Sequence, residues 1–208
     1  MSVRITKKMQ LRMDKIRSMR RPEAQPYFYF PELLPSERLL YCPLDYNNYL
    51  TLNELFLDDD SPHTNPEFKQ LERIEQYVVS LLEFAQYSPK RCGKDWIIHL
   101  ADSNLPIGVI HLYDLTKETR LNNHLNCTIG FAIAAPYRRN GYAFEAVYHL
   151  LQYIFNNFDL THILAYTTHD NVPSQQLLQK LRFKRNDQDY SHPDHYAFFE
   201  LSKVVFNA

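Results

Sequence analysis

A short basic turn between an apolar strand and a helix has residue types suited to binding an anion. The turn carries Arg138 and Arg139, followed by Gly141 and the small Ala143. Glycine lets the backbone approach a ligand closely, and the first N–H groups of the following helix lack intrahelical partners. Together with the positive end of the helix dipole, these groups predict a pyrophosphate site. Taken alone, an ordinary strand–helix connection is the alternative interpretation.

The elements that position this turn follow from hydrophobic periodicity. Apolar runs over 96–100 and 107–113 predict two strands of a hairpin, joined at Asp102-Ser103-Asn104. The periodicity then predicts a strand over 126–134, a helix over 143–157, a strand over 162–167, a helix over 173–181, and strands around 183 and over 196–201.

Upstream, residues 38–44 predict a first strand, followed by a helix to about Leu57 that Asp45 or Asn47 would cap. Asp58-Asp59-Asp60 is interpreted as a solvated acidic run. Pro66 is expected to open a second helix. This order of elements predicts one α+β domain, a mixed α/β sandwich, and not a doubly wound parallel sheet.

The N-terminal 35 residues differ in composition from the rest. Residues 1–21 carry eight lysines and arginines and one acid, although the net charge of the whole chain is −1. A solvated arm is favoured there over a helix that binds RNA or an acidic surface, so no nucleic-acid partner is predicted. Prolines and aromatics over 22–35 predict an extended linker. The chain therefore divides into an extension over 1–35 and a domain over 36–208.

The remaining composition argues against several classes of protein. Cys42, Cys92 and Cys127 are widely spaced without a CxxC pair, which predicts reduced thiols and neither a disulfide framework nor a zinc site. His192 and His195 lie on either side of a proline with no third ligand in sight, so no metal is expected. No apolar run has membrane-spanning length and no signal peptide is evident. A cytoplasmic protein without a membrane partner is predicted.

Three segments together resemble the GNAT superfamily of N-acetyltransferases, in particular its RimJ/RimL-like branch of ribosomal-protein-alanine acetyltransferases. Arg138-x-x-Gly141-x-Ala143 is similar to the acetyl-CoA signature Arg/Gln-x-x-Gly-x-Gly/Ala. Residues 171–183 resemble the block Asn-x-x-Ser…Leu-x-Lys-Leu-Gly-Phe, and 36–44 resemble the opening Thr-Glu-Arg-Leu-x-Leu-Arg-Pro-Leu. The resemblance covers 36–202 and implies a mostly antiparallel mixed sheet of about six to seven strands with flanking helices.

The resemblance implies acetyl-CoA as co-substrate and no metal. Pantetheine would enter a gap beside the strand 126–134 and pair with backbone groups of Phe131 and Ile133. The other residues implied in cofactor binding are Arg138, Arg139, Asn140, Gly141, Tyr142, Ala143, Asn171 and Ser174. An amine, either a small molecule or a protein N-terminus, would attack the thioester directly in a ternary complex. A homodimer is the default assembly.

The chain departs from the family at the positions that would carry catalysis. Thr128 stands where the branch often has a glutamate base, and Leu178 stands where many members have a tyrosine acid. Ser174, three residues after the helix asparagine, is the acid that the branch offers instead. Arg182 replaces the usual glycine before the final phenylalanine.

The general base is therefore unassigned. His111 and Asp114 on the second hairpin strand and Glu145 in the first turn of the helix are candidates. Each also fits a structural role, as a half-buried strand histidine, a strand-end acid or an acid at a helix N-terminus. A second interpretation is an acetyl-CoA-binding regulatory module without turnover, and an acyl group other than acetyl is also open.

Overall fold

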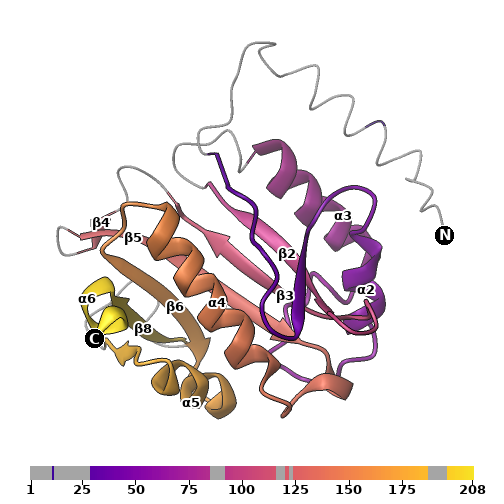
Figure 1. Ribbon diagram of the computed structural model, residues 1–208. Coiled ribbons are helices and arrows are strands. Elements are labelled where there is room, and N and C mark those ends of the chain that lie inside the picture. Colours follow the sequence, from indigo (N-terminus) through magenta and orange to yellow (C-terminus); the bar gives the residue numbers. More distant parts are fainter. Residues whose placement is uncertain (1–10, 12–28, 85–91, 116–119, 122–123, 187–195) are drawn as a thin grey trace.

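The computed structural model describes residues 11, 29–84, 92–115, 120–121, 124–186 and 196–208. The basic segment 1–21, apart from Leu11, and the pair His192 and His195 lie outside the described residues. A single sheet with the strand order β1-β2-β3-β5-β6-β8-β7 runs through the described chain (Figure 1), and the short β4 pairs with β5. Every pairing is antiparallel except that of β5 with β6. The predicted α+β fold with a mostly antiparallel sheet is confirmed.

The strands are β1 (Leu39–Pro43), β2 (Lys94–Leu100), β3 (Pro106–Tyr113), β4 (Arg120–Leu121), β5 (His124–Ile133), β6 (His162–Thr168), β7 (Lys184–Arg185) and β8 (Tyr196–Ser202). The α-helices are α2 (Leu50–Phe56), α3 (Leu71–Val79), α4 (Tyr142–Asn157), α5 (Val172–Lys180) and α6 (Lys203–Asn207). A π-helical turn (Ser80–Phe84) extends α3, and a 3₁₀ turn (Ala135–Tyr137) precedes α4.

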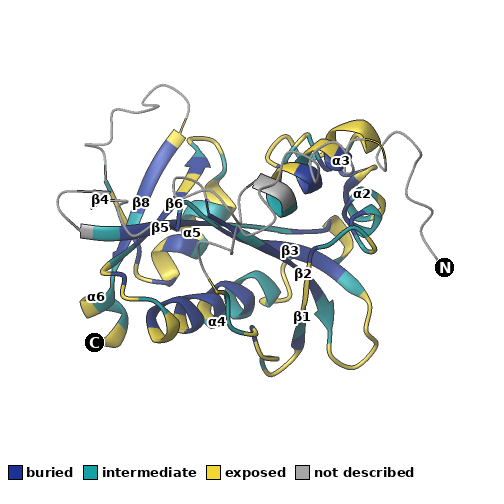
Figure 2. Cartoon of the chain, turned by 90° about the horizontal axis from the view of Figure 1, so that it is seen from above, coloured by how far each residue is buried: buried dark blue, intermediate teal, exposed yellow. Residues whose placement is uncertain are grey.

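Helices cover both faces of the sheet (Figure 2). Alternation along β3 divides its side chains, because Val109 packs with α2 and α3 whereas Ile110 and Leu112 pack with α4. The apolar stripe of α4 is fully buried and consists of Ala146, Val147, Leu150, Leu151 and Ile154. Burying each of its larger side chains stabilises the fold by roughly 1.5–3 kcal/mol. We refer to the side of the sheet under α2 and α3 as the α2/α3 face.

The start of α2 differs from its prediction. The helix begins at Leu50 after Tyr49, and no side chain caps it. The Asp45 carboxylate instead accepts hydrogen bonds from the N–H groups of Asn47 (2.6 Å) and Asn48 (3.1 Å). Asp45 therefore closes a local turn before the helix, which aspartate does as readily as capping.

The prediction that Pro66 opens the second helix was also wrong. Phe68 N–H bonds to Asn65 C=O (3.1 Å) and Lys69 N–H to Pro66 C=O (3.3 Å), which makes separate turns. Helix α3 begins only at Leu71, after Gln70 in an extended conformation. The fixed φ of proline suits turns as well as helix starts, so proline alone does not fix a helix boundary.

The parallel pair β5–β6 separates part-way along its length. Asn126–Ile129 pair with His162–Ala165, and there the pairing ends. Both strands continue, β5 to Ile133 and β6 to Thr168. Residues 130–133 therefore have a strand neighbour only on the β3 side within the described chain. We call the opening between 130–133 and 166–168 the strand gap.

The segment before β1 packs against α4. Leu33 is buried in the same core as the helix, and Phe30 lies edge-on to Phe158, with 6.0 Å between ring centroids. The Tyr153 hydroxyl donates to Pro31 C=O at 2.8 Å. The side chains of α4 thus hold residues 30–33 close to the domain.

Candidate active site

The turn after β5 presents backbone N–H groups at one end of the strand gap. Gly141 has φ +80° and stands directly before α4, a left-handed conformation that favours glycine. Arg139 shares the left-handed region at φ 68°. The N–H groups of the first helical turn have no carbonyl partner within the helix. This geometry suits an anionic group of a ligand.

The side chain of Arg138 is engaged away from this turn. Its Nε donates to Ile133 C=O at 2.8 Å, and its guanidinium forms an ion pair with Asp59. Burial raises the pKa of Asp59, but hydrogen bonds from Thr64, Ser61 and Arg138 outweigh it and lower that pKa below its ordinary value. Asp59 is buried, so the interpretation of a solvated acidic run is wrong at this residue.

Backbone groups of β5 are directed at the strand gap. Ala134 N–H donates to Ile107 C=O on the β3 side at 2.9 Å. Successive residues of a strand point their backbone groups to opposite sides. The N–H groups of Phe131 and Ile133 therefore point into the gap. Their pairing with pantetheine stays a prediction.

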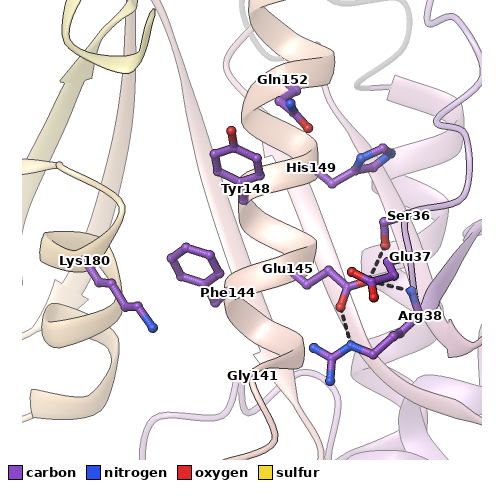
Figure 3. A pocket seen from close by; sticks show the side chains of 10 residues that line it. All are labelled: Ser36, Glu37, Arg38, Gly141, Phe144, Glu145, Tyr148, His149, Gln152 and Lys180. Atoms are coloured by element: carbon purple, nitrogen blue, oxygen red, sulfur yellow. Dashed lines mark hydrogen bonds and ion pairs between the residues drawn. The ribbon is translucent and has the colours of Figure 1, made fainter. Parts of the chain in front are cut away.

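A groove of about 460 Å³ lies on the outer side of α4 next to Gly141 (Figure 3). Phe144 and Tyr148 stack at an interplanar angle of 4°, and the Lys180 ammonium lies 4.7 Å from the Phe144 ring centroid. Aromatic rings and a cation at the end of a phosphate-binding turn suit a nucleotide.

Glu145, one of the three base candidates, lies in this groove and is fully engaged. Its carboxylate accepts hydrogen bonds from the Ser36 hydroxyl, the Arg38 N–H and the Arg38 Nε, each at 2.7 Å. Burial raises its pKa, but these bonds outweigh burial and hold the pKa below its ordinary value. The carboxylate joins the start of α4 to the residues before β1 (Figure 3).

Asp114, the second candidate, follows β3 with φ 55°. The residue before it, Tyr113, pairs with Thr128. Thr128 belongs to the part of β5 that is still paired with β6. Asp114 therefore lies beyond the closed end of the strand gap.

His111, the third candidate, lies at the start of the strand gap. It pairs across the sheet with Gly130, the first residue of β5 beyond the parallel pairing. Its Nδ1 lies 2.9 Å from Asp95 Oδ2, and the Tyr77 hydroxyl from α3 also bonds to Asp95. The ring stacks on Phe68, with 5.8 Å between centroids. His111 is therefore the candidate that lies beside the β5 residue at which the gap begins.

Asp95, Tyr77 and Tyr113 were not singled out from the sequence. The hairpin held a signal for Asp95, because a strand aspartate before the apolar run Trp96-Ile97-Ile98 must find a partner when buried. Nothing in the sequence indicated Tyr77, whose helix packs over this part of the sheet.

The start of α5 lies beside the open end of β6. Asn171 caps the helix by accepting the N–H of Ser174 at 3.3 Å. Gln175 donates to the carbonyls of Thr168 (3.2 Å) and His169 (2.8 Å), which holds the helix against the strand end. Within the described part of the chain, the Ser174 hydroxyl makes no hydrogen bond.

Across the same opening, His63 of the α2–α3 loop reaches β6. Its Nδ1 lies 3.2 Å from Thr168 Oγ1. Because Asp59 of this loop contacts Arg138 after β5, the loop touches both strands that border the strand gap.

Among the described residues, no three His, Cys, Asp or Glu side chains gather as metal ligands. Within the same ranges, no helix has the length and apolarity required to cross a bilayer.

The comparisons with known proteins agree with this geometry. Residues 38–184 match the acetyltransferase (GNAT) domain, which is more than half of the chain. The chain belongs to the GNAT acetyltransferase family. It is similar to the uncharacterized N-acetyltransferase YoaA of Bacillus subtilis, with 30% identity over 117 residues, 56% of this chain and 63% of that relative. The match thus spans less than two thirds of the relative.

Solved GNAT structures share the fold. An acetyltransferase of the GNAT family from Bacillus anthracis has a TM-score of 0.61 at 20% identity, covering 81% of this chain and 96% of its own. RimL, a ribosomal L7/L12 α-N-protein acetyltransferase in complex with coenzyme A, has a TM-score of 0.64 at 15% identity, covering 83% and 98%. At these identities the likeness concerns the fold.

Proposed function

We propose that this chain transfers an acetyl group from acetyl-CoA to a primary amine in a ternary complex. The observation that carries the proposal is the strand gap with the phosphate-binding turn at its end. Family membership supports acyl transfer as the reaction class.

The chain's own groups account for binding of the co-substrate. The N–H groups of Phe131 and Ile133, which no described strand pairs on the gap side, would bond to pantetheine amides there, as an added strand would. The N–H groups of residues 139–143 would hold the pyrophosphate. Phe144, Tyr148 and Lys180 would take the nucleotide end in the groove of Figure 3.

Positioning would supply most of the catalysis. The amine nitrogen attacks the thioester carbonyl carbon, and the carbon–sulfur bond breaks without a covalent enzyme intermediate. Ser174 would donate a proton to the departing thiolate. A thiol with a pKa near ~8.5 leaves readily, so this donor should contribute modestly.

The acceptor would approach from the α2/α3 face. The opening of the domain, residues 36–44, resembles the RimJ/RimL-like branch, which supports a protein N-terminus as acceptor. A small-molecule amine is the alternative. The reduced-thiol pattern supports action in the cytoplasm, and a homodimer is the default assembly.

Release of free CoA thiol, followed against a panel of amines, tests the function. The panel contains peptides with different N-terminal residues, polyamines and aminoglycosides, and calorimetric titration measures acetyl-CoA affinity in parallel. Turnover with one class of amine is expected. Tight acetyl-CoA binding with no turnover on any amine would favour the regulatory module, for which the departures at Thr128 and Leu178 argue.

A further inference from the structure

A histidine and an aspartate are buried side by side on the α2/α3 face. Asp95 and His111 are directly paired residues of β2 and β3, so their side chains leave the sheet on the same face. His111 Nδ1 is 2.9 Å from Asp95 Oδ2, and the exposed fractions of the two side chains are 8% and 0%. Tyr77 donates its hydroxyl hydrogen to the same carboxylate oxygen.

The surroundings fix the plane of the imidazole. Phe68 and Tyr113 each stack on the ring, with centroids 5.8 Å away and interplanar angles of 24° and 27°. Burial and the charge of Asp95 raise the pKa of Tyr77 well above its ordinary value, so its hydroxyl stays protonated as a donor. With Nδ1 held by Asp95, only the Nε2 edge of the ring is available for a reaction.

The ring is not completely buried, because the exposed fraction of the His111 side chain is 8%. Within the described residues, Nε2 of His111 has no hydrogen-bond partner, and Asp95 Oδ1 is the one buried side-chain nitrogen or oxygen atom without one.

Gly130 lies beside this ring at the start of the strand gap. A Cβ at Gly130 would lie 2.0 Å from the Tyr113 hydroxyl oxygen and 3.4 Å from His111 Cδ2. A side chain at this position would clash with Tyr113. Its absence lets the histidine edge and the Tyr113 hydroxyl lie over the first backbone unit beyond the parallel pairing.

We propose that His111 Nε2 is the general base for the acceptor amine and that Asp95 is its positioning residue, holding the imidazole as the Nδ1–H tautomer. This inference rests on the proposed acetyl transfer. As the amine nitrogen bonds to the thioester carbon, Nε2 takes one proton from it and the carbon–sulfur bond breaks. The thiolate takes a proton from water or from Ser174, which regains one from solvent. His111 then returns its proton to solvent, so products are the amide and the free thiol.

The buried carboxylate explains why the base can accept charge in so apolar a place. Asp95 Oδ1 is buried without a partner, while Oδ2 contacts the Tyr77 hydroxyl and His111 Nδ1. A proton taken up at Nε2 would place its positive charge beside this carboxylate, as in the acid–histidine pairs of other enzymes. The titratable groups that face the ring are Asp95 from β2, Tyr77 from α3 and Tyr113 from β3.

Three variants and a control test the proposal. His111→Gln should lower kcat about 10²- to 10⁴-fold while leaving acetyl-CoA affinity unchanged. Asp95→Asn should lower kcat about 10- to 100-fold. Tyr77→Phe keeps the histidine–carboxylate contact and should cost less than Asp95→Asn. His99→Gln, the same change at a half-buried histidine of β2 outside the site, should have wild-type activity.

A spectroscopic measurement separates positioning from simple packing. Two-bond ¹H–¹⁵N spectra of histidine-labelled protein, assigned with His111→Gln, should show His111 as the Nδ1–H tautomer in the wild type. Asp95→Asn should shift the ring toward Nε2–H. If Asp95→Asn does not fold, the tautomer of the wild type and the kcat values of His111→Gln and Tyr77→Phe test the proposal.

The outcomes separate this inference from the proposed function. Amine turnover that survives His111→Gln at half the wild-type kcat or more would overturn the base while leaving acetyl transfer intact. A wild-type protein that acetylates no amine would overturn the proposed function. In that case, an Nδ1–H tautomer of His111 would still support Asp95 as its positioning residue, and an Nε2–H tautomer would overturn that role.

Discussion

At the scale of single residues, Gly141 is the clearest link between backbone conformation and binding. Its φ of +80° costs other residues roughly 1–2 kcal/mol, most for β-branched ones. A Cβ there would meet Arg38 Nη2 at an ordinary 3.5 Å, so conformation and not steric clash is decisive. Gly141→Val should weaken acetyl-CoA about tenfold or more in calorimetric titration, and Gly141→Asn, which tolerates this region, should weaken it less. Equal affinities for both variants and wild type would remove the turn from the cofactor site.

Asn171 and Ser174 make a second residue-scale pair with separable roles. Ser174→Ala should lower kcat toward the small end of about 10²- to 10⁴-fold without changing acetyl-CoA affinity, since water can replace the donor. Asn171→Ala removes the cap and should weaken acetyl-CoA binding and stability together. Steady-state kinetics on fully folded protein decide between acid and packing residue. If Ser174→Ala loses stability but keeps turnover per folded molecule, the hydroxyl serves only the helix.

Site residues that act within one contiguous stretch of sequence could be predicted. Contacts between residues that are distant in the sequence mostly could not. Gly141 and its turn could be read directly from neighbouring positions. The direction of Arg138 could not, because its partner Asp59 lies 79 positions earlier. Asp95 and His111 are an intermediate case. The predicted hairpin placed them on neighbouring strands, but the register shift at Ile98/His99 decides that they pair directly, and this shift was not predicted.

At the scale of elements, one carboxylate joins the start of α4 to the residues before β1. Because hydrogen bonds hold the pKa of Glu145 below its ordinary value of 4.5, its stabilising effect is present above that pH and is lost as pH falls through the lower folded-state value. Glu145→Gln should lower the free energy of unfolding by about 1 kcal/mol near neutral pH. The deficit should shrink below about pH 4, which urea denaturation at both pH values would measure. A deficit independent of pH would mean that shape, and not charge, matters at this contact.

Element types and most element starts followed from the sequence, whereas the starts of α2 and α3 did not. Periodicity identified β2, β3, β5, β6, α4 and α5, because each buries one face or one stripe in a core. The starts of α2 and α3 were mispredicted because Asp45 and Pro66 favour turns as strongly as helix ends. The end of the β5–β6 pairing was not predicted, since the unpaired residues 130–133 are apolar like those of an ordinary buried strand.

At the scale of the whole molecule, the basic segment 1–21 should be separable from the domain. Within the described residues, Leu33 is the first buried residue of the core that contains α4. Removing residues 1–21 should therefore leave the melting temperature nearly unchanged. Calorimetry of the shortened protein, with full-length protein as control, checks this. A fall of many degrees would show that the basic segment packs on the domain, and salt-dependent RNA binding lost with it would give the segment a different role.

The separation of β5 from β6 makes the sheet two half-sheets joined by a short seam. Four residue pairs connect them, whereas β6 and β8 share seven. A ligand that lies along the gap would connect the two half-sheets, because it adds backbone hydrogen bonds that the protein alone lacks. Amides of β6 should then exchange with deuterium faster than those of β3 in the free protein, and acetyl-CoA should slow β6 selectively. The co-substrate would thus also be a structural part of the sheet. Each release of product would briefly remove the hydrogen bonds that connect the two half-sheets across the gap.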